Sequence, residues 1–401
     1  MPEASLASQR TLLLEPTAVN LILAEARRCQ AEGRDLVSLM RGEPDFQTPP
    51  HIVEAAVRAL RSGRTGYPDN RGEAALREAA AEKLKRDNRI EYDPGCEILI
   101  TSGATFGIYA ALAAILDEGD QVLLPDPIYD AYRSPIRLAG GTIRSVPARL
   151  QDGRFRLDRE DLESAWTPAC KALLLNTPWN PLGTVFTESE LRDIGEFLES
   201  RDLLLISDEI YEAITYAGHH HVSPAALSDP LRARCILINS LSKTYAMTGW
   251  RIGYCAGPAE LIQAMFLVLQ QSSRGPALFV QDAAATALRG PQDCVAEMRQ
   301  EYECCRAQVL EELTGLPGVG LIHPEGGFFA LVDIRELSLP SNQVRRQLLA
   351  DTGVVVVHGA AYGQGGEGTL RVSFAAGGEN LSRGLQRLRK GLLEIAEAVH
   401  N

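Results

Sequence analysis

The feature that most limits what this chain can fold into is a series of short apolar runs that alternate with helical patterns. Each run has the length of a strand and leads into a turn-rich or polar stretch; the runs are Glu97–Ile100, Gln121–Leu124, Lys171–Leu175, Leu203–Ser207 and Cys235–Asn239. This alternation is typical of βαβ units, whose sheet is mostly parallel and covered by helices on both faces. The sequence therefore predicts an α/β protein.

Polar residues and glycines follow four of these runs, at the point where each predicted strand ends. The stretches are Ser102–Thr105, Asn176–Gly183, Asp208–Tyr211 and Ser240–Lys243. The carboxyl ends of parallel strands share one edge of a sheet, and open α/β sheets bind their ligands at that edge. We therefore expect four motifs that are distant in sequence to converge on one crevice.

Lys243 is the central residue of the predicted crevice. It lies in the stretch Asn239–Gly253, with Ser240 before it and Arg251 after it. Most lysines are simply solvated, but here an amine stands beside hydroxyl and guanidinium groups that suit an anion. An amine next to an anion site favours a phosphate-bearing carbonyl compound held as a Schiff base, such as pyridoxal phosphate.

The other strand-end motifs offer the groups that pyridoxal phosphate requires. Its pyridine nitrogen needs a carboxylate to stay protonated, and Asp208 is the candidate. Its ring oxygen needs hydrogen-bond donors, for which Asn180 and Tyr211 are available. The phosphate suits a helix start with small hydroxyls, which the segment Thr101–Thr105 provides, with Ser240 and Arg251 completing the cup. Singly each residue has an ordinary structural interpretation, but their joint position at strand ends favours the cofactor site.

Composition and charge exclude several classes of protein. The chain has 401 residues, 45% hydrophobic and 23% charged, as in ordinary globular proteins. A formal net charge of -12 disfavours nucleic acid as a partner. Neither a signal peptide nor a membrane span is apparent, so the prediction is a cytoplasmic protein. No metal site is predicted, because the consecutive histidines at 219–221 cannot all point at one ion.

The length predicts more than one domain. The apolar runs and their helices assign residues 49–295 to a large domain that carries the cofactor site. Residues 296–401 show a different pattern, with short strand-like runs, and are predicted to form a smaller C-terminal domain. Residues 1–48 are predicted to join this domain as an N-terminal arm. One long helix is expected from about Ala277 onward, where the chain leaves the large domain.

Taken together, the motifs resemble a known family. They are GEPDFQTP, TGYPDNRGEAALR, TSGAT, PDPIYDAY, NTPWNPLGTVF, SDEIYEAITY, SLSKTYAMTGWRIGY and RVSFA, and they extend from Arg41 to Ala375. In these stretches the chain is similar to class I/II aminotransferases of the fold type I pyridoxal-phosphate enzymes, in particular the aspartate and aromatic aminotransferase group. The resemblance implies an enzyme that moves an amino group from an L-amino acid to a 2-oxo acid.

The resemblance also implies a role for individual residues. It makes Lys243 the residue that binds pyridoxal 5'-phosphate as a Schiff base and transfers protons. It assigns the rest of the cofactor contacts to Ala104, Thr105, Tyr129, Asn180, Asp208, Tyr211, Ser240 and Arg251, and it makes Tyr67 reach the neighbouring subunit's phosphate. Arg371, the backbone of Gly42 and the amide of Asn180 would bind the substrate α-carboxylate. The family is dimeric, which implies a homodimer with shared active sites.

The sequence departs from the family's pattern at positions that bear on the substrate. Some aspartate-selective relatives carry a lysine where this chain has Thr105, and Tyr129 takes a place often filled by tryptophan. Arg274 lies where relatives have small polar residues near the partner's site. We hypothesise that Arg274 binds an acidic or extended polar substrate.

Two alternatives stay open at the level of sequence. The cofactor motifs do not fix which bond breaks, so a pyridoxal-phosphate lyase or cyclase on the same scaffold is one of them. A non-catalytic sensor, as in transcription regulators with an aminotransferase-like domain, is the other. Such regulators need a DNA-binding module, but only about forty residues precede the GEPDF motif, and the net negative charge disfavours DNA binding.

Overall fold

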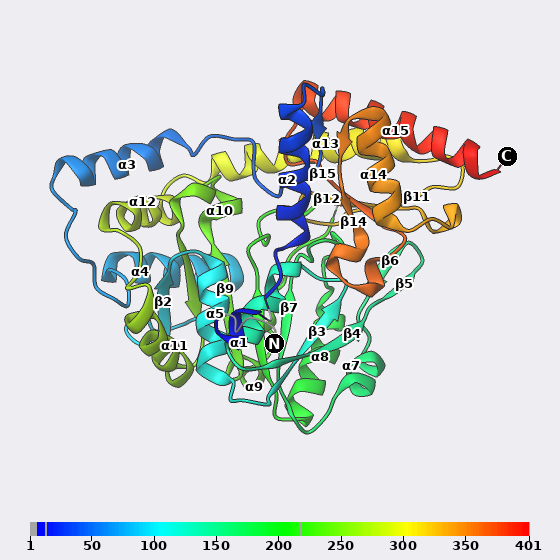
Figure 1. The fold of residues 1–401 in the computed structure, drawn as a ribbon. Helices are drawn as coiled ribbons and strands as arrows, with labels where there is room; N and C mark the ends of the chain where they lie inside the picture. Colours follow the sequence, from blue (N-terminus) through cyan, green and yellow to red (C-terminus); the bar gives the residue numbers. More distant parts are fainter. Residues whose placement is uncertain (1–5, 13, 217, 401) are drawn as a thin grey trace.

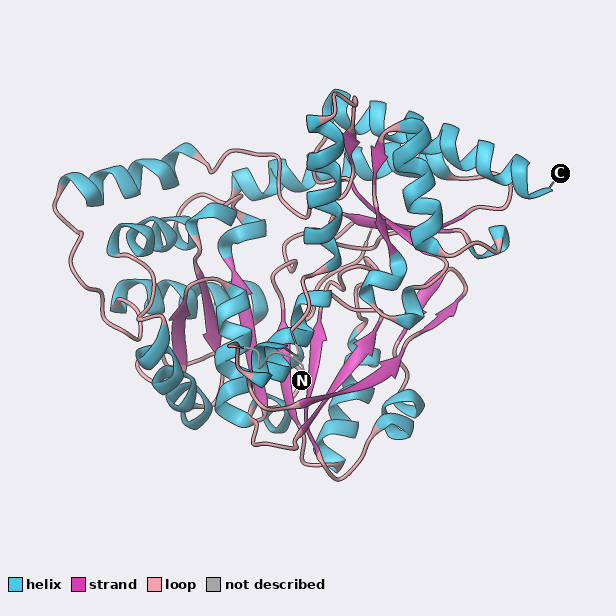
Figure 2. Cartoon of the chain, in the orientation of Figure 1, coloured by secondary structure: helices cyan, strands magenta, loops and turns pink. Residues whose placement is uncertain are grey.

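A seven-stranded sheet forms the centre of the computed structural model, which describes residues 6–12, 14–216 and 218–400 (Figures 1 and 2). Its strands are β2 (Ile98–Thr101), β3 (Gln121–Asp126), β4 (Thr142–Pro147), β7 (Cys170–Asn176), β8 (Leu204–Asp208), β9 (Cys235–Ser240) and β10 (Gly253–Ala256), in the order β2-β10-β9-β8-β7-β3-β4. β10 is antiparallel to both of its neighbours, and the other neighbouring pairs are parallel. The predicted mostly parallel sheet is confirmed.

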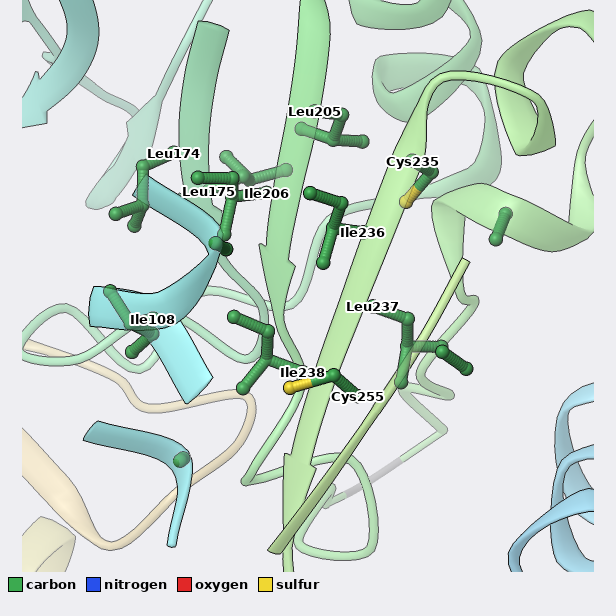
Figure 3. Packing of buried hydrophobic residues seen from close by; sticks show 14 of the residues in the cluster. Ile108, Leu174, Leu175, Leu205, Ile206, Cys235, Ile236, Leu237, Ile238 and Cys255 are labelled. Carbon is green, nitrogen blue, oxygen red and sulfur yellow. The ribbon is translucent and has the colours of Figure 1, made fainter. Parts of the chain in front are cut away.

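Helices cover both faces of this sheet, which explains why its central strands β7, β8 and β9 are almost continuously apolar, whereas the edge strand β4 is largely exposed. Every residue of β9 is buried, and Figure 3 shows Leu205 and Ile206 of β8 beside Ile236 and Ile238 of β9, with Ile108 of α5 near them. The helices packed around the sheet are α4 (Ala74–Lys83), α5 (Ala104–Ile115), α6 (Arg133–Leu138), α7 (Arg159–Ala165), α8 (Glu188–Ser200), α9 (Asp229–Arg232), α11 (Ala259–Ser272) and α12 (Leu278–Arg289). α3 (Pro50–Arg61) lies on α12. A strand buried on both faces has no solvent side that would require alternation.

A second, smaller sheet lies at the other end of the described chain (upper right in Figure 1). Its strands, in the order β11-β12-β15-β14, are β11 (Gly320–Ile322), β12 (Phe329–Asp333), β15 (Thr369–Ser373) and β14 (Val357–His358). The helices beside it are α13 (Asp293–Leu313), α14 (Ser341–Thr352) and α15 (Gly378–His400). Their buried side chains form a hydrophobic cluster separate from that of the large sheet.

The N-terminal segment packs on this smaller part of the molecule. Helix α2 (Ala18–Ala31) buries Ile22 and Ala26 in a cluster with residues of α14 and β14. Strand β1 (Val37–Ser38) pairs in parallel with β13 (Val354–Val355). The short elements α1 (Gln9–Leu12), β5 (Arg149–Gln151) and β6 (Arg154–Arg156) complete the described strands and α-helices outside the site. The domain boundaries at residues 48 and 295 stay predictions.

The single long helix expected from Ala277 was wrong, because two helices occupy this region. α12 ends at Arg289, and α13 begins at Asp293 after Gly290 and Pro291. Proline has no amide hydrogen to donate and its ring clashes with the preceding helical turn, so the helix ends before it. Among the described residues, no helix combines the length and the apolar character needed to cross a membrane.

Candidate active site

The four strand-end motifs meet in one cavity of about 470 Å³. The stretches after β2, β7, β8 and β9 all contribute to its wall, as the parallel topology predicts. Of the site residues selected from the sequence, those that line the cavity are Gly42, Ala104, Thr105, Tyr129, Asn180, Asp208, Tyr211, Ser240, Lys243, Arg251 and Arg371. Tyr67 and Arg274 do not line it.

Lys243 lies in a single helical turn, α10 (Leu241–Thr244), directly after β9 (Figure 1). The side chain of Ser240 caps this turn by accepting the amide hydrogen of Ser242 at 3.1 Å. The Lys243 Nζ donates to the carbonyl oxygen of Gly42 at 2.5 Å. Burial lowers the pKa of Lys243 to about 8, with Arg251 acting in the same direction and Glu43 opposing it. A substantial fraction of this amine is therefore neutral near physiological pH.

Asp208 ends β8 as a buried carboxylate that faces the cavity. Its Oδ2 accepts a hydrogen bond of 2.6 Å from the hydroxyl of Tyr132, and Oδ1 accepts the amide of Ile210 at 3.3 Å. Burial raises the pKa of Asp208 to about 6, although the bond from Tyr132 acts in the opposite direction. A cation beside Asp208 would lower this pKa and so would itself be bound favourably.

Asn180 and Tyr211 lie near Asp208 because of contacts within the loops that follow β7 and β8. The side chain of Asn176 accepts the amide of Asn180 at 2.7 Å and donates to the carbonyl oxygen of Asp208 at 3.0 Å. Tyr211 is buried, with its ring edge-on to that of Phe328 at a centroid distance of 5.4 Å. Burial raises the pKa of Tyr211 well above its usual value, so its hydroxyl is a proton donor.

Groups that attract anions lie together at the start of helix α5. Helix α5 begins at Ala104 after Gly103, whose φ of 85° suits glycine. A side chain at Gly103 would come within 2.8 Å of Nη2 of Arg251, which shows how closely the guanidinium approaches the start of the helix. Free amide groups at a helix start and a guanidinium both attract anions. Ser240 lines the same cavity and donates to the carbonyl oxygen of Ile252 at 3.0 Å.

Arg371 comes from the smaller sheet, on β15, and is buried with only 2% of its surface exposed. Nη2 donates to the carbonyl oxygen of Met40 at 2.8 Å, and Nη1 donates to Oδ1 of Asn180 at 3.3 Å. The guanidinium lies 4.1 Å from the ring centroid of Phe329. Within the described chain its Nε has no hydrogen-bond partner, so the group retains donor capacity at the cavity wall.

Tyr67 and Arg274 lie on the surface rather than in the cavity. Tyr67 is 92% exposed, which is unusual for a tyrosine. Arg274 is also exposed, in left-handed backbone with φ 55°. It follows Ser273, whose hydroxyl lies 2.8 Å from that of Ser102, just before the α5 helix start. A Cβ placed on Gly275 would lie 3.8 Å from the carbonyl oxygen of Asn70, so the segments that carry Tyr67 and Arg274 are neighbours.

Comparison with known proteins decides the family. The family model "Aminotransferase class I and II" matches residues 34–388. The chain belongs to the class I and II aminotransferases. It is 40% identical over 393 residues to a probable aspartate/prephenate aminotransferase of Aquifex aeolicus, covering 97% of this chain and 99% of that protein. It is 39% identical over 389 residues to aromatic-amino-acid aminotransferase 2 of Thermococcus litoralis, covering 96% and 98%.

A solved structure supports the same assignment. The aspartate aminotransferase of Thermus thermophilus with maleate superimposes with a TM-score of 0.91 at 36% identity, covering 97% of this chain and all of that one. The expected aminotransferase fold and enzymatic function are therefore confirmed. Aminotransferases of class I and II generally depend on pyridoxal phosphate, and the groups that line this cavity fit that cofactor. The Asp208 carboxylate suits a protonated nitrogen, and the Arg251 guanidinium beside the start of α5 suits a phosphate.

Sequence reasoning missed several residues of the cavity wall. Tyr132 lay within the motif PDPIYDAY, three residues after Tyr129, and its distance from Asp208 in sequence concealed the hydrogen bond between them. Asn176 opens the motif NTPWNPLGT, and its contact with the amide of Asn180 shows only in the folded chain. Asp130 also lines the cavity, where its Oδ2 accepts the amide of Ala18 at the start of α2.

Proposed function

We propose that this aminotransferase works through pyridoxal 5'-phosphate bound by Lys243. The observation that carries the proposal is the buried Lys243 amine, whose pKa is lowered to about 8 in the same cavity as Asp208. When bound, pyridoxal phosphate would withdraw electrons from the substrate's α-carbon and carry the amino group between donor and acceptor. A lysine with an ordinary pKa would be almost fully charged at neutral pH and less reactive.

The residues near Asp208 would hold the ring. Asp208 would accept a hydrogen bond from the protonated pyridine nitrogen, and Tyr132 would keep the carboxylate oriented through its 2.6 Å hydrogen bond. The Asn180 amide and the Tyr211 hydroxyl would donate to the ring oxygen, and Tyr129 would pack on the ring face. Since the Asp208 pKa of about 6 results mainly from burial, a bound cation would favour its ionised form.

Two separate arginines would bind the cofactor phosphate and the substrate α-carboxylate. Arg251, Ser240 and the α5 start at Ala104 and Thr105 would bind the phosphate. Arg371 would bind the substrate α-carboxylate, with the Gly42 backbone and Asn180 beside it. The ring of Phe329, 4.1 Å from the guanidinium, restricts its orientation and so lowers the entropy lost on binding.

Lys243 would also transfer the proton on which the reaction depends. In its neutral form Nζ can accept the proton from the substrate's α-carbon, hold it as an ammonium and deliver it at the next step. The carbonyl oxygen of Gly42, 2.5 Å from Nζ, would orient the protonated amine between these steps. General acid-base transfer of this kind typically contributes about 10²–10⁴-fold in rate.

Labelling and absorbance test the cofactor assignment. Wild-type protein reconstituted with pyridoxal phosphate should show a visible absorbance band, and borohydride should fix the label on the peptide that contains Lys243. Lys243→Ala should abolish both results. Lys85→Ala is the matched control, because Lys85 is an exposed lysine paired with Glu91 and should leave both unchanged. A colourless wild type would refute the proposal.

We further propose that the substrates are an L-amino acid and a 2-oxo acid, and that two copies of the chain share their active sites in the cytoplasm. The 92% exposure of Tyr67 and the neighbouring position of Arg274 support a surface that serves a second copy. Arg274 would favour acidic or extended polar side chains. Arg274→Ala should reduce the rate with acidic donors relative to neutral ones in a donor panel, and unchanged relative rates would contradict this role.

A further inference from the structure

Behind the phosphate-binding residues lies a chain of buried polar groups that the catalytic roles do not use. We propose that Glu212 is a positioning residue that acts through Asn239 to hold Ser240 in its phosphate-binding orientation. This inference rests on the proposed pyridoxal-phosphate function. Glu212 directly follows Tyr211, so one segment would supply both a cofactor contact and the support for another.

The hydrogen bonds of this chain lead from Glu212 to Ser240. The Asn239 side chain donates to Oε1 of Glu212 at 2.6 Å, and its Oδ1 accepts the amide of Ser240 at 2.7 Å. The asparagine thus uses one end of its amide for the carboxylate and the other for the backbone of the phosphate-binding serine. Rotation of the Asn239 side chain would break both bonds together.

Glu212 is itself held from helix α4 and the turn after it. The Lys83 ammonium contacts Oε1 of Glu212, and the Asn88 side chain donates to Oε2 at 2.7 Å. Lys83 also donates to Oδ1 of Asn88 at 2.7 Å. The side chains of Lys83 and Glu212 are only 8% and 10% exposed. A carboxylate with its oxygens occupied in this way has one orientation, which it passes on to Asn239.

Two further observations bear on this arrangement. Glu209, Glu212 and His221 approach one another as metal ligands do, but the Lys83 ammonium already neutralises Glu212, so we assign the group a hydrogen-bonding role. Glu212 and Asn239 also line a second cavity, of about 490 Å³, which is distinct from the active-site cavity. Ser240 lines both cavities. Because space rather than packed side chains adjoins Glu212 and Asn239 there, hydrogen bonds are needed to fix Asn239.

The test removes the support without leaving a buried charge. In the double variant Lys83→Met/Glu212→Met, apolar side chains of similar length replace the ion pair, an exchange that is often neutral for stability. Reconstitution with pyridoxal phosphate and with pyridoxal, which lacks the phosphate, then gives the dissociation constant of each ligand. We expect the preference for the phosphorylated form to fall about tenfold, the scale of one hydrogen bond to a charged group, with little change for pyridoxal. Asn239→Ala should give the same selective loss.

A control variant distinguishes positioning from general loosening. Arg345→Met/Glu25→Met removes another ion pair, between α14 and α2, outside the residues that line the active site. This control should keep the wild-type preference. An unchanged preference in Lys83→Met/Glu212→Met, or an equal loss in the control, would overturn the positioning role. A wild type that does not prefer pyridoxal phosphate over pyridoxal would instead overturn the proposed function on which the inference rests.

Discussion

Replacing Arg371 by lysine tests whether the buried guanidinium binds the substrate α-carboxylate. In the structure its two terminal nitrogens donate to Met40 and to Asn180, and the ring centroid of Phe329 lies 4.1 Å away. A planar carboxylate can be bound by two parallel hydrogen bonds from a guanidinium, whereas an ammonium acts as a point charge. Arg371→Lys would therefore keep the charge and lose one of the two bonds.

The size of the effect follows from that lost bond. A hydrogen bond to a charged group contributes about 1.5–3 kcal/mol, so kcat/KM for a good amino donor should fall about 10- to 150-fold. The assay compares this donor with its own α-amide, which has no carboxylate. Because the amide never makes the missing bond, Arg371→Lys should change its kcat/KM by less than about threefold.

A comparison of the two substrates distinguishes carboxylate binding from a wider structural effect. If the variant lost the same factor with the acid and with the α-amide, Arg371 would not bind the carboxylate, and the reasoning would be refuted. The unfolding temperature of the variant serves as a check, since Asn180 loses a buried partner in the variant as well.

Three other changes have defined expected results. Burial raises the pKa of Asp208 from 3.8 to about 6, so the folded, cofactor-free chain holds a proton that the unfolded chain loses as pH rises through this window. Its stability should therefore fall by about 2 kcal/mol between pH 4 and pH 7, and denaturant titrations of Asp208→Asn should lack that drop. Gly103→Ala places a methyl group 2.8 Å from Nη2 of Arg251 and should weaken phosphate-dependent cofactor binding, measured by absorbance. Gly119→Ala is the control, because Gly119 also has a positive φ but no atom lies within 4 Å of the added carbon, and it should leave cofactor binding unchanged. Leu205→Ala, in the β8 core of Figure 3, should cost about 2–5 kcal/mol of unfolding free energy, and a loss below about 1 kcal/mol would mean that the core closes around the missing side chain.

Much of the fold could be predicted because its determinants are local. Strands buried on both faces are apolar throughout, and the five predicted runs became β2, β3, β7, β8 and β9. The helix predictions failed at Gly290 and Pro291, where a single break divides one helical pattern into α12 and α13. Pro291 marks that break in the sequence itself.

The candidate active-site cavity was predicted in outline for a topological reason. Parallel strands bring their carboxyl ends to one edge, so motifs at strand ends had to meet, and Lys243, Asp208 and Asn180 line one cavity. The position of Arg371 does not follow from the shared edge of the parallel strands, because Arg371 lies on β15 of the smaller sheet. The family resemblance, rather than any spacing, predicted that Arg371 belongs to the site.

The sequence by itself determined the sheet, the edge that carries the site and the lysine at its centre. The tertiary structure decided which side chains support that site. Tyr132 meets Asp208 across 76 residues, and Lys83 meets Glu212 across 129. Such contacts have no periodicity and no local motif, because they depend on how separate elements pack. The amine of Lys243 is therefore specified by its motif, while its pKa and the support of Ser240 arise only once the chain has folded.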